Sequence, residues 1–415
     1  MASPKLRFKE FDGKWSLTSL NQLSTKIGDG IHATPKYDEN GIIPFINGNN
    51  LVNGKILINE NIKRISAEEF QKYNQILSDR TLFLSINGTI GNLAFYKNEK
   101  VLLGKSVCFI NLKDDIDDKF VYLLLQSPQL TKTFNSELTG TTIKNLSLAT
   151  VRNSEFYCPS VAEQTKIASF LSAVDEKISL LTKKHELLSQ YKQGMMQKLF
   201  SQQIRFKADD GSEFEEWEEK RLIDSIDTNI KWSFTGGPFG SNLKSEDYTA
   251  TGIRIIQLQN IGDGVFLDSY KIYTSFEKAN ELLSCNIYPS EILISKMGDP
   301  VARCCIVPDY HDRYVMCSDG IRLVVDKLKF SSVFMFYQIN YQDFRQSASD
   351  VSTGSTRKRI GLNDLKQLPI KVPCLEEQTK IANFLSAIDQ KIEVVAQQIE
   401  QAKQWKKGLL QQMFV

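Results

Sequence analysis

Residues 163–200 read EQTKIASFLSAVDEKISLLTKKHELLSQYKQGMMQKLF, and residues 377–414 read EQTKIANFLSAIDQKIEVVAQQIEQAKQWKKGLLQQMF. The two segments align without a gap and are identical at 19 of 38 positions, whereas composition alone would give roughly two matches. Each segment follows a stretch of similar length that has no helical repeat. The chain is therefore a tandem duplication, and we expect the two helices to hold two similar modules a fixed distance apart.

Shorter blocks extend the duplication into the rest of the chain. The matched pairs are 7–9 with 205–207, 41–50 with 252–260, 82–91 with 292–301, and 139–151 with 353–365. The offset between partners drifts from 198 to 214 residues, so the insertions fall inside the modules and not inside the helices. This pattern favours a shared frame that carries two different specificities.

Composition places few limits on the chain. Its 415 residues are 41% hydrophobic and 24% charged, which suits two to four ordinary domains. No apolar run reaches ~18 residues, and the first residues have no signal-peptide pattern. Seven scattered cysteines without a Cys-x-x-Cys pair indicate reduced thiols and a cytoplasmic location. The net charge of only +2 means that any nucleic-acid surface must come from local clustering.

Within each module the sequence predicts short strands broken by turns. Strand candidates are 41–46, 80–85, 105–110 and 320–325, short buried helices are expected at 120–126 and 333–341, and glycine turns at 53–54, 87–88 and 262–264. Each module is therefore expected to be α+β with a twisted, β-rich sheet.

The two long helices carry a heptad pattern. Ser160-x-x-Glu163 resembles a capping box before the first helix, and Pro373 precedes the second. Apolar residues recur at steps of three and four, which predicts an antiparallel coiled coil with pseudo-twofold symmetry. A helix of this length spans about 57 Å, so the modules could reach two DNA half-sites about 34 Å apart. The seam positions are Leu171, Val174, Ile178, Leu181, His185, Leu188, Lys192, Met195 and Leu199, and Leu385, Ile388, Ile392, Val395, Ile399, Ala402, Lys406, Leu409 and Met413.

Polar residues in this seam admit two interpretations. Lys192 and Lys406 occupy equivalent positions, and their stems either pack while the ammonium groups reach water or serve to set the register. His185, whose repeat partner is Ile399, is best explained as a structural residue, because no second histidine or carboxylate cluster accompanies it.

Motifs for catalysis are missing from the sequence. There is no Walker A motif, no Gly-x-Gly-x-x-Gly after a strand and no aminomethylase signature, and the three histidines have no ligand spacing. We therefore expect a chain that is not an enzyme, with no catalytic residue, no metal and no cofactor of its own.

Candidate DNA-binding residues lie in matching places of the two copies. Loops of hydroxyl residues, glycine and cations suit phosphate oxygens, and amide side chains can pair with adenine edges. A solvated or turn-forming role was the alternative for each of them. The candidates are Thr139, Gly140, Thr141, Thr142, Lys144, Asn47, Asn49, Asn50, Ser85 and Asn87 in the first copy, and Thr353, Gly354, Ser355, Thr356, Arg357, Lys358, Arg359, Gln257, Gln259, Asn260 and Lys296 in the second.

Taken together, these blocks resemble the specificity subunit of type I restriction–modification systems. The resemblance covers nearly the whole chain and is most specific in Glu163-Gln164-x-Lys166-Ile167-Ala168 and its copy from Glu377. It implies two target recognition domains that read a bipartite target in double-stranded DNA. It also implies docking of two methyltransferase subunits, which supply S-adenosylmethionine and methylate adenine at N6, and of restriction subunits that use ATP and Mg²⁺. One departure is Gly298-Asp299-Pro300, which replaces the glycine-rich turn at 88–91.

The predicted organisation is therefore a recognition domain at 1–158, a spacer helix at 159–200, a second recognition domain at 201–372 and a second spacer helix at 373–415. No membrane partner is expected. The main alternative is a coiled-coil scaffold whose modules bind proteins and not DNA, and a stand-alone nuclease is a more remote one.

Overall fold

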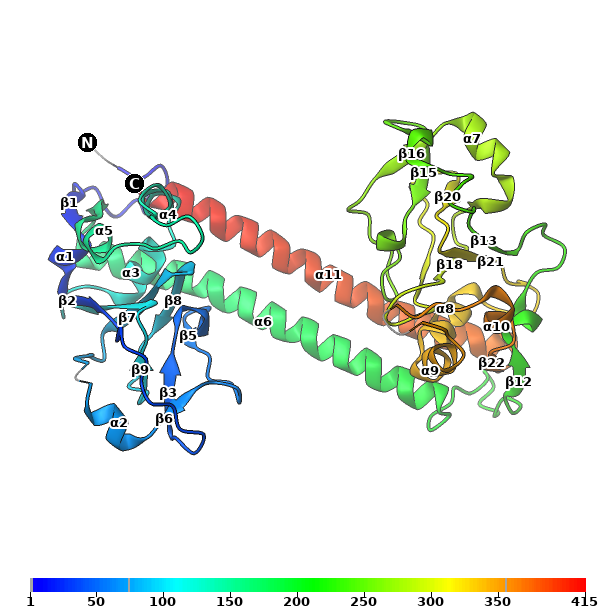
Figure 1. Cartoon of the computed structure of the whole chain (residues 1–415), viewed down its shortest axis with the longest axis horizontal. Coiled ribbons are helices and arrows are strands. Elements are labelled where there is room, and N and C mark those ends of the chain that lie inside the picture. The colour runs from blue at the N-terminus through cyan, green and yellow to red at the C-terminus, as the bar shows by residue number, and fades with distance from the viewer. Residues whose placement is uncertain (1–2, 74, 355–356) are drawn as a thin grey trace. The chain divides into compact units, whose positions relative to one another are not determined.

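The computed structural model describes residues 3–73, 75–354 and 357–415. The chain divides into two compact units (Figure 1): unit 1 runs to Lys184 and includes Val395–Val415, and unit 2 is His185–Val394. The long helices α6 (Val161–Phe200) and α11 (Leu375–Met413) each contribute to both units. Each unit therefore contains the first half of one long helix and the second half of the other.

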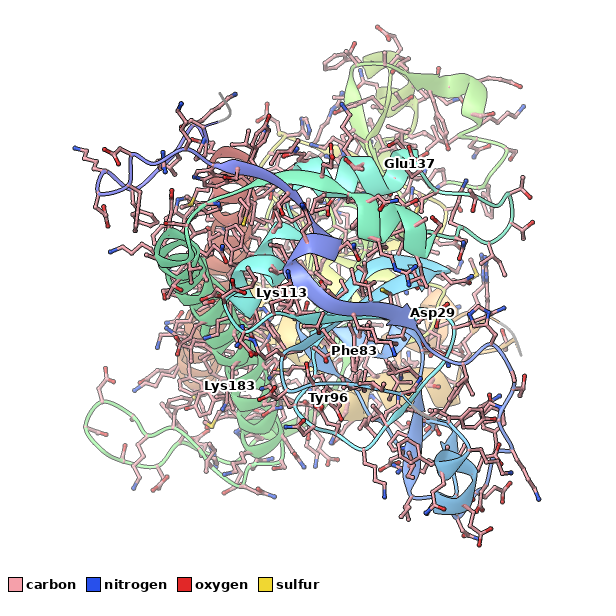
Figure 2. All side chains as sticks on the ribbon, turned by 90° about the vertical axis from the view of Figure 1, so that its left-hand side faces the viewer. Asp29, Phe83, Tyr96, Lys113, Glu137 and Lys183 are labelled. Atoms are coloured by element: carbon pink, nitrogen blue, oxygen red, sulfur yellow. The ribbon has the colours of Figure 1, made fainter. Side chains whose placement is uncertain are left out.

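Unit 1 is built around a four-stranded antiparallel sheet in the order β2-β10-β7-β8. Its central strands β7 (Thr81–Asn87) and β10 (Val107–Leu112) are almost entirely buried. Both faces of the sheet are covered, and for this reason the two strands read as continuous apolar runs without alternation. The outer strands are β2 (Ser24–Asp29), whose last residue is labelled in Figure 2, and β8 (Thr89–Phe95).

Unit 2 repeats this sheet with the order β13-β21-β18-β19, again antiparallel. The strands are β13 (Phe234–Gly236), β21 (Gly320–Leu323), β18 (Ile292–Ser295) and β19 (Cys304–Ile306). The matching strand order confirms the tandem duplication of an α+β module that the repeated sequence predicted.

A second, mixed sheet also occurs in both units, and it is larger in unit 2. Unit 1 has the order β6-β3-β9, with β3 (Ile43–Ile46) parallel to β9 (Leu102–Leu103) and antiparallel to β6 (Arg64–Ile65). Unit 2 has β14-β16-β15-β20-β17, so it adds an edge strand on each side. Its strands are β14 (Tyr248–Thr249), β16 (Ile272–Thr274), β15 (Ile253–Ile256), β20 (Tyr314–Met316) and β17 (Asn286–Ile287).

The remaining elements surround these sheets. A two-stranded sheet precedes each long helix: β1 (Ser16–Ser19) with β11 (Glu155–Cys158), and β12 (Glu218–Arg221) with β22 (Pro369–Val372). The short hairpin β4 (Leu51–Val52) with β5 (Lys55–Ile56) belongs to unit 1. The short helices are α1 (Leu20–Leu23), α2 (Ala67–Gln71), α3 (Asp118–Leu124), α4 (Pro128–Ser136), α5 (Leu148–Asn153), α7 (Phe276–Glu281), α8 (Ser332–Asn340), α9 (Gln342–Asp350) and α10 (Leu362–Lys366). The 3₁₀ turns are η1 (Gly48–Asn50), η2 (Leu222–Ser225), η3 (Ser245–Asp247), η4 (Leu258–Asn260) and η5 (Leu283–Cys285).

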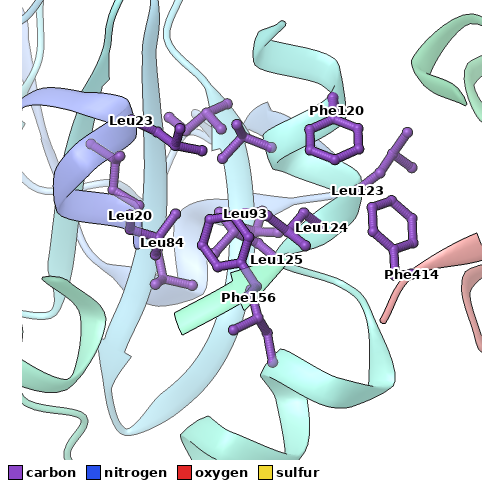
Figure 3. Packing of buried hydrophobic residues seen from close by; sticks show 14 of the residues in the cluster. Leu20, Leu23, Leu84, Leu93, Phe120, Leu123, Leu124, Leu125, Phe156 and Phe414 are labelled. Carbon is purple, nitrogen blue, oxygen red and sulfur yellow. The ribbon is translucent and has the colours of Figure 1, made fainter. Parts of the chain in front are cut away.

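The main core of each unit joins its sheet to the end of a long helix from the other repeat. In unit 1, Phe414 packs on Phe120 with ring centroids 5.5 Å apart (Figure 3). In unit 2, Phe200 packs in the same way on Phe334, at 5.6 Å. Burying a phenylalanine contributes about 1.5–3 kcal/mol. Each unit is therefore stabilised by the C-terminal end of the long helix that belongs to the other repeat.

An arginine–glutamate pair fastens each long helix to its module. In unit 1 both carboxylate oxygens of Glu163 accept hydrogen bonds from Arg7, at 2.7 Å each. In unit 2 Glu377 accepts from Arg205 at 3.3 and 2.8 Å, and both glutamates are almost completely buried. Glu163, which was predicted to take part in a capping box, thus directs its carboxylate to Arg7.

The adjacent glutamines serve the same purpose. Gln164 Oε1 accepts from the backbone N–H of Asp117, where α3 begins, and Gln378 Oε1 accepts from that of Ser331, where α8 begins. The Glu-Gln motif thus ties the start of each long helix to a short helix and to an N-terminal arginine of the same unit.

Each seam lysine forms an ion pair with an aspartate in the long helix of the other repeat, so the two pairs are exchanged between the repeats. Lys192 Nζ lies 2.6 Å from Asp389 in unit 2, and Lys406 Nζ lies 2.7 Å from Asp175 in unit 1. The two lysine side chains are only 23% and 15% exposed. The lysine stems therefore pack, and their ammonium groups are held in ion pairs. Along the predicted seam, every position is buried or half-buried.

Two further findings concern the chain as a whole. Across the described residues, no helix combines the length and the apolar character that a membrane crossing needs. The cysteines are free, and all but Cys374 are buried. Cys304 and Cys305 lie together in β19, and burial raises the pKa of the Cys305 thiol to about 12.

Candidate nucleic-acid interface

The ends of the predicted phosphate-binding loops are joined by the same main-chain bonds in both units. The loop at 139–145 is closed by two hydrogen bonds between the main chains of Thr139 and Asn145, each 2.9 Å long. The loop at 353–359 is closed in the same way between Thr353 and Arg359, at 2.9 and 2.8 Å. Both are seven-residue surface loops whose ends are fixed by main-chain bonds.

Each loop needs its glycine. Gly140 has φ +88° and Gly354 has φ +100°, a region that other residues adopt with strain. A Cβ added at Gly140 would lie 2.2 Å from the carbonyl oxygen of Ile143, and one at Gly354 would lie 2.6 Å from that of Arg357. The chain can fold back this tightly only without a side chain at these positions.

A strand-end turn supports each loop. Gly88 N–H donates to the carbonyl oxygen of Lys144 at 3.0 Å, and Gly298 N–H donates to that of Lys358 at 3.1 Å. The residues that follow the two loops bond back to Ile86 and Lys296 respectively, at 2.8 and 3.0 Å. The predicted residues Asn87 and Lys296 are therefore brought beside the loops, and both are half-buried.

The 3₁₀ turn after the mixed sheet's central strand joins the same cluster. Asn92 Nδ2 donates to the carbonyl oxygen of Gly48 in η1 at 3.2 Å. In unit 2, Arg303, the residue before β19, donates to the carbonyl oxygen of Leu258 in η4 at 3.4 Å. In both units, three segments that are distant in sequence are thus bonded to one another: the glycine loop, the strand-end turn and the 3₁₀ turn. We call these three segments the edge cluster of the module.

The amide candidates in these turns have separate roles. Asn50 Oδ1 accepts from the backbone N–H of Asn47, and Asn260 Oδ1 accepts from that of Gln257, at 2.9 Å in both cases. Asn260 is completely buried, so base contact by this residue was a wrong prediction. Asn49 and Gln259, at the equivalent middle position, are exposed. Among the six amides, these two are the ones free to reach a base edge.

Amide side chains elsewhere in these turns are partly engaged. Asn50 Nδ2 also donates to the carbonyl oxygen of Leu57, and Asn47 Oδ1 accepts from the Ser106 hydroxyl at 3.1 Å. Gln257 Nε2 donates to the Tyr248 hydroxyl at 3.3 Å. Their hydrogen-bonding groups hold the turn together, which is the turn-forming role considered as the alternative.

The prediction that Ser85 contacts DNA was also wrong. The residue is completely buried within β7, and its hydroxyl accepts from the backbone N–H of Asn92 at 2.8 Å. It supports the hairpin and cannot touch a ligand. Ser355 and Thr356, which were also predicted to bind DNA, lie outside the described residues.

Three consecutive cations in the second loop differ in their surroundings. Arg359 Nη2 lies 2.5 Å from Asp319, and Lys358 Nζ donates to the hydroxyl of Ser349 in α9. Arg357 is exposed and forms no hydrogen bond or ion pair within the described part of the chain. In the first loop Thr139, Gly140, Thr141, Thr142 and Lys144 are all exposed. Nothing in the sequence indicates that Asp319 and Ser349 contact this loop, because no local pattern links them to it.

No group of three or more histidine, cysteine, aspartate or glutamate side chains arranged to hold a metal ion occurs among residues 3–73, 75–354 and 357–415. The edge cluster of each module consists instead of main-chain N–H groups, hydroxyls, side-chain amides and cations, which are the groups that contact nucleic acid.

Comparison with known proteins agrees with this geometry. Residues 13–190 and 215–404 each match the type I restriction modification DNA specificity domain. The putative type I restriction enzyme MjaX specificity subunit of Methanocaldococcus jannaschii is 27% identical over 98% of this chain and 94% of its own length. The MjaVIII specificity subunit of the same organism is 25% identical over 81% and 78%.

A solved structure shares the fold. The S subunit of the type I restriction–modification system from M. genitalium aligns over 100% of this chain and 99% of its own, with a TM-score of 0.58 and 18% sequence identity. Two copies of the specificity domain, together with the repeated edge cluster, place this chain in the type I restriction–modification DNA specificity family, whose members are specificity subunits and not enzymes.

Proposed function

We propose that each unit reads one half of a bipartite sequence in double-stranded DNA through the edge cluster described above. The observation that carries this proposal is the recurrence of the cluster: the same glycine loop is bonded to the same strand-end turn in both units. The groups that each loop presents, hydroxyls, main-chain amides and cations, suit phosphate oxygens. The surrounding side chains differ between the copies, as two different half-sites require.

The proposed division of labour follows from the chemistry of each group. Exposed threonines and main-chain amides of the loops suit phosphate oxygens, and Arg357 adds an unpaired cation. Asn49 and Gln259 are exposed amides beside these loops, so they are placed to pair with adenine edges in the major groove. Phosphate contacts would position each module, and the amides would contribute to sequence discrimination.

The long helices are proposed to form an antiparallel coiled coil that sets the distance between the half-sites. The exchanged pairs Lys192–Asp389 and Lys406–Asp175 support this arrangement. So does the composition of the units, since each combines the first half of one helix with the second half of the other. An antiparallel pair is the simplest arrangement that brings such halves together.

Partner subunits are proposed to supply the chemistry. We expect two methyltransferase subunits to dock on this chain and to carry S-adenosylmethionine, and restriction subunits to carry ATP and Mg²⁺. A solved relative, 16% identical with a TM-score of 0.58, is described in terms of complex assembly of the type I R-M system. This chain would contribute the choice of sequence, and no reaction step.

Footprinting tests the proposal directly. The purified complex with its methyltransferase should protect two short DNA segments that are separated by an unread gap. One continuous footprint would contradict bipartite reading. A complete lack of protection on genomic DNA would favour the alternative, a scaffold that binds proteins.

The spacer is tested by lengthening both helices together. Seven residues inserted after Lys184 and seven after Val394 preserve the heptad register and add about 10 Å of helix. This length corresponds to roughly three base pairs. Mapping of methylated adenines should show a longer gap between the half-sites. An unchanged gap would mean that the helices do not set the spacing.

A further inference from the structure

The most exposed aromatic side chain in the described part of unit 2 belongs to Phe239. Phe239 is 83% exposed, whereas Pro238 directly before it is buried. The carbonyl oxygen of Phe239 accepts from the N–H of Asn242 at 2.8 Å, which closes a tight turn. A phenylalanine that is kept in water loses the stabilisation that burial would provide. Single exposed apolar side chains are common, and what distinguishes Phe239 is the segment that anchors it.

The turn is fixed to the body of the unit. Gly237 N–H donates to the carbonyl oxygen of Gly320, at the start of β21, at 2.8 Å. A Cβ at Gly237 would lie only 1.6 Å from the carbonyl oxygen of Cys317, so only glycine permits this approach. Phe239 therefore projects from a well-anchored support.

The same anchor segment carries the second recognition loop. Asp319 receives the Arg359 ion pair at 2.5 Å, and its carbonyl oxygen accepts from Lys296 N–H at 2.7 Å. The turn of Phe239 bonds to the residue that follows Asp319. The turn that begins at Phe239 and the cationic loop are thus anchored on the same segment of unit 2.

Unit 1 has an equivalent anchored glycine, and the residue two positions after it has different chemistry. Gly30 N–H donates to Val107, at the start of β10, at 3.0 Å, and a Cβ at Gly30 would lie 2.2 Å from the carbonyl oxygen of Leu103. Gly30 therefore corresponds to Gly237. Two residues later stands His32, whose side chain is 73% exposed and whose Nε2 lies 2.7 Å from Asp29.

We propose that the exposed residue two positions after the anchored glycine is a base-contacting position in each module: an apolar reader, Phe239, in unit 2 and a hydrogen-bonding reader, His32, in unit 1. The proposal rests on the DNA-binding function proposed above. Phenylalanine has no hydrogen-bonding group, so Phe239 would contact a thymine methyl group or enter between two base pairs. Histidine can donate and accept, so His32 would address polar base edges.

The test compares Phe239→Ala with the original complex, both bound to its methyltransferase. We expect at least a tenfold loss of affinity for the target and relaxed base preference in one half-site only. The other half-site and the salt dependence should not change, because no phosphate contact is removed. The matched control is Leu328→Ala, which removes a side chain of 85% exposure that follows the opposite end of β21 and should leave DNA binding intact.

Two modified DNAs distinguish the kinds of apolar contact. Deoxyuridine in place of thymidine removes the methyl group, and 2-aminopurine fluorescence reports unstacking. An unchanged half-site preference in Phe239→Ala would overturn the inference, even where the original complex shows a bipartite footprint. Absence of that footprint from the original complex would instead refute the proposed function itself. Because Phe239 is exposed, the folded state should survive the substitution, and an unchanged melting temperature checks this.

Discussion

Replacing Arg205 by alanine should weaken unit 2 severely. Arg205 is the ion-pair partner of Glu377, a side chain with no exposure, and the remaining contact of that carboxylate is the hydrogen bond from Trp217 Nε1 at 3.2 Å. Breaking a buried pair typically costs about 3–5 kcal/mol because one charge stays buried and uncompensated. Arg205 is 17% exposed, and water can partly replace it, so we expect a loss of about 3 kcal/mol.

Urea unfolding followed by pulsed hydrogen exchange and mass spectrometry measures the two units separately. With an m value of about 2 kcal/mol per molar urea, the unfolding midpoint of unit 2 should fall by about 1.5 M, while that of unit 1 stays. The control is Lys207→Ala, which removes the exposed pair with Glu213 and should change little. Adding Glu377→Gln to the Arg205 variant should restore part of the loss. If the Arg205 and Lys207 variants unfold alike, the buried-clamp argument is refuted.

Three further outcomes are expected. Gly354→Ala should lower DNA affinity at least tenfold with unchanged circular dichroism, since its φ is +100° and its Cβ would strike the carbonyl oxygen of Arg357; unchanged binding would remove the loop from the interface. Asp175→Asn should cost only about 1 kcal/mol, seen as a drop of a few degrees in the melting temperature, because Lys406 keeps its hydrogen bond to Gln126 at 3.1 Å; a far larger drop would show that the ion pair dominates. A thiol reagent at pH 8 should label the native chain once, at Cys374, and seven times in urea. Burial raises the pKa of the other six thiols, so they stay protonated and unreactive in the native chain. Several labels on the native chain would contradict this burial.

The sequence was sufficient for features that repeat over many residues. The long helices are present because apolar side chains recur at helical spacing through each of them. The central strands β7 and β10 were also predictable, since buried strands need apolar residues on both faces. In both cases many residues carry the same signal, so a few polar exceptions do not obscure it.

Individual side chains were harder to place. Asn260 and Ser85 have the chemistry of base and phosphate contacts, but both are directed into the module and satisfy main-chain N–H groups. A local signal existed for the first, because an amide three residues after a turn's start can cap that turn. Ser85 lies within a continuous apolar run, which already favoured burial.

Long-range pairs could not be read from the sequence at all. Arg7 meets Glu163 across 156 residues, and no periodic pattern connects the two positions. The duplication offers the one available hint, because an arginine near the start of each repeat accompanies a glutamate at the start of each helix. That hint indicates a shared role without naming the contact.

The exchanged ion pairs explain why the helices align without gaps while the modules drift. Asp175 and Lys192 are 17 residues apart in α6, as are Asp389 and Lys406 in α11. Each helix contributes the aspartate to one unit and the lysine to the other. One extra residue in one helix would rotate everything beyond it by about 100°, so the two pairs could not both form. An insertion in a module's loop disturbs that module alone. Length is therefore constrained in the helices and free in the loops, which is how a fixed frame can carry changing specificities.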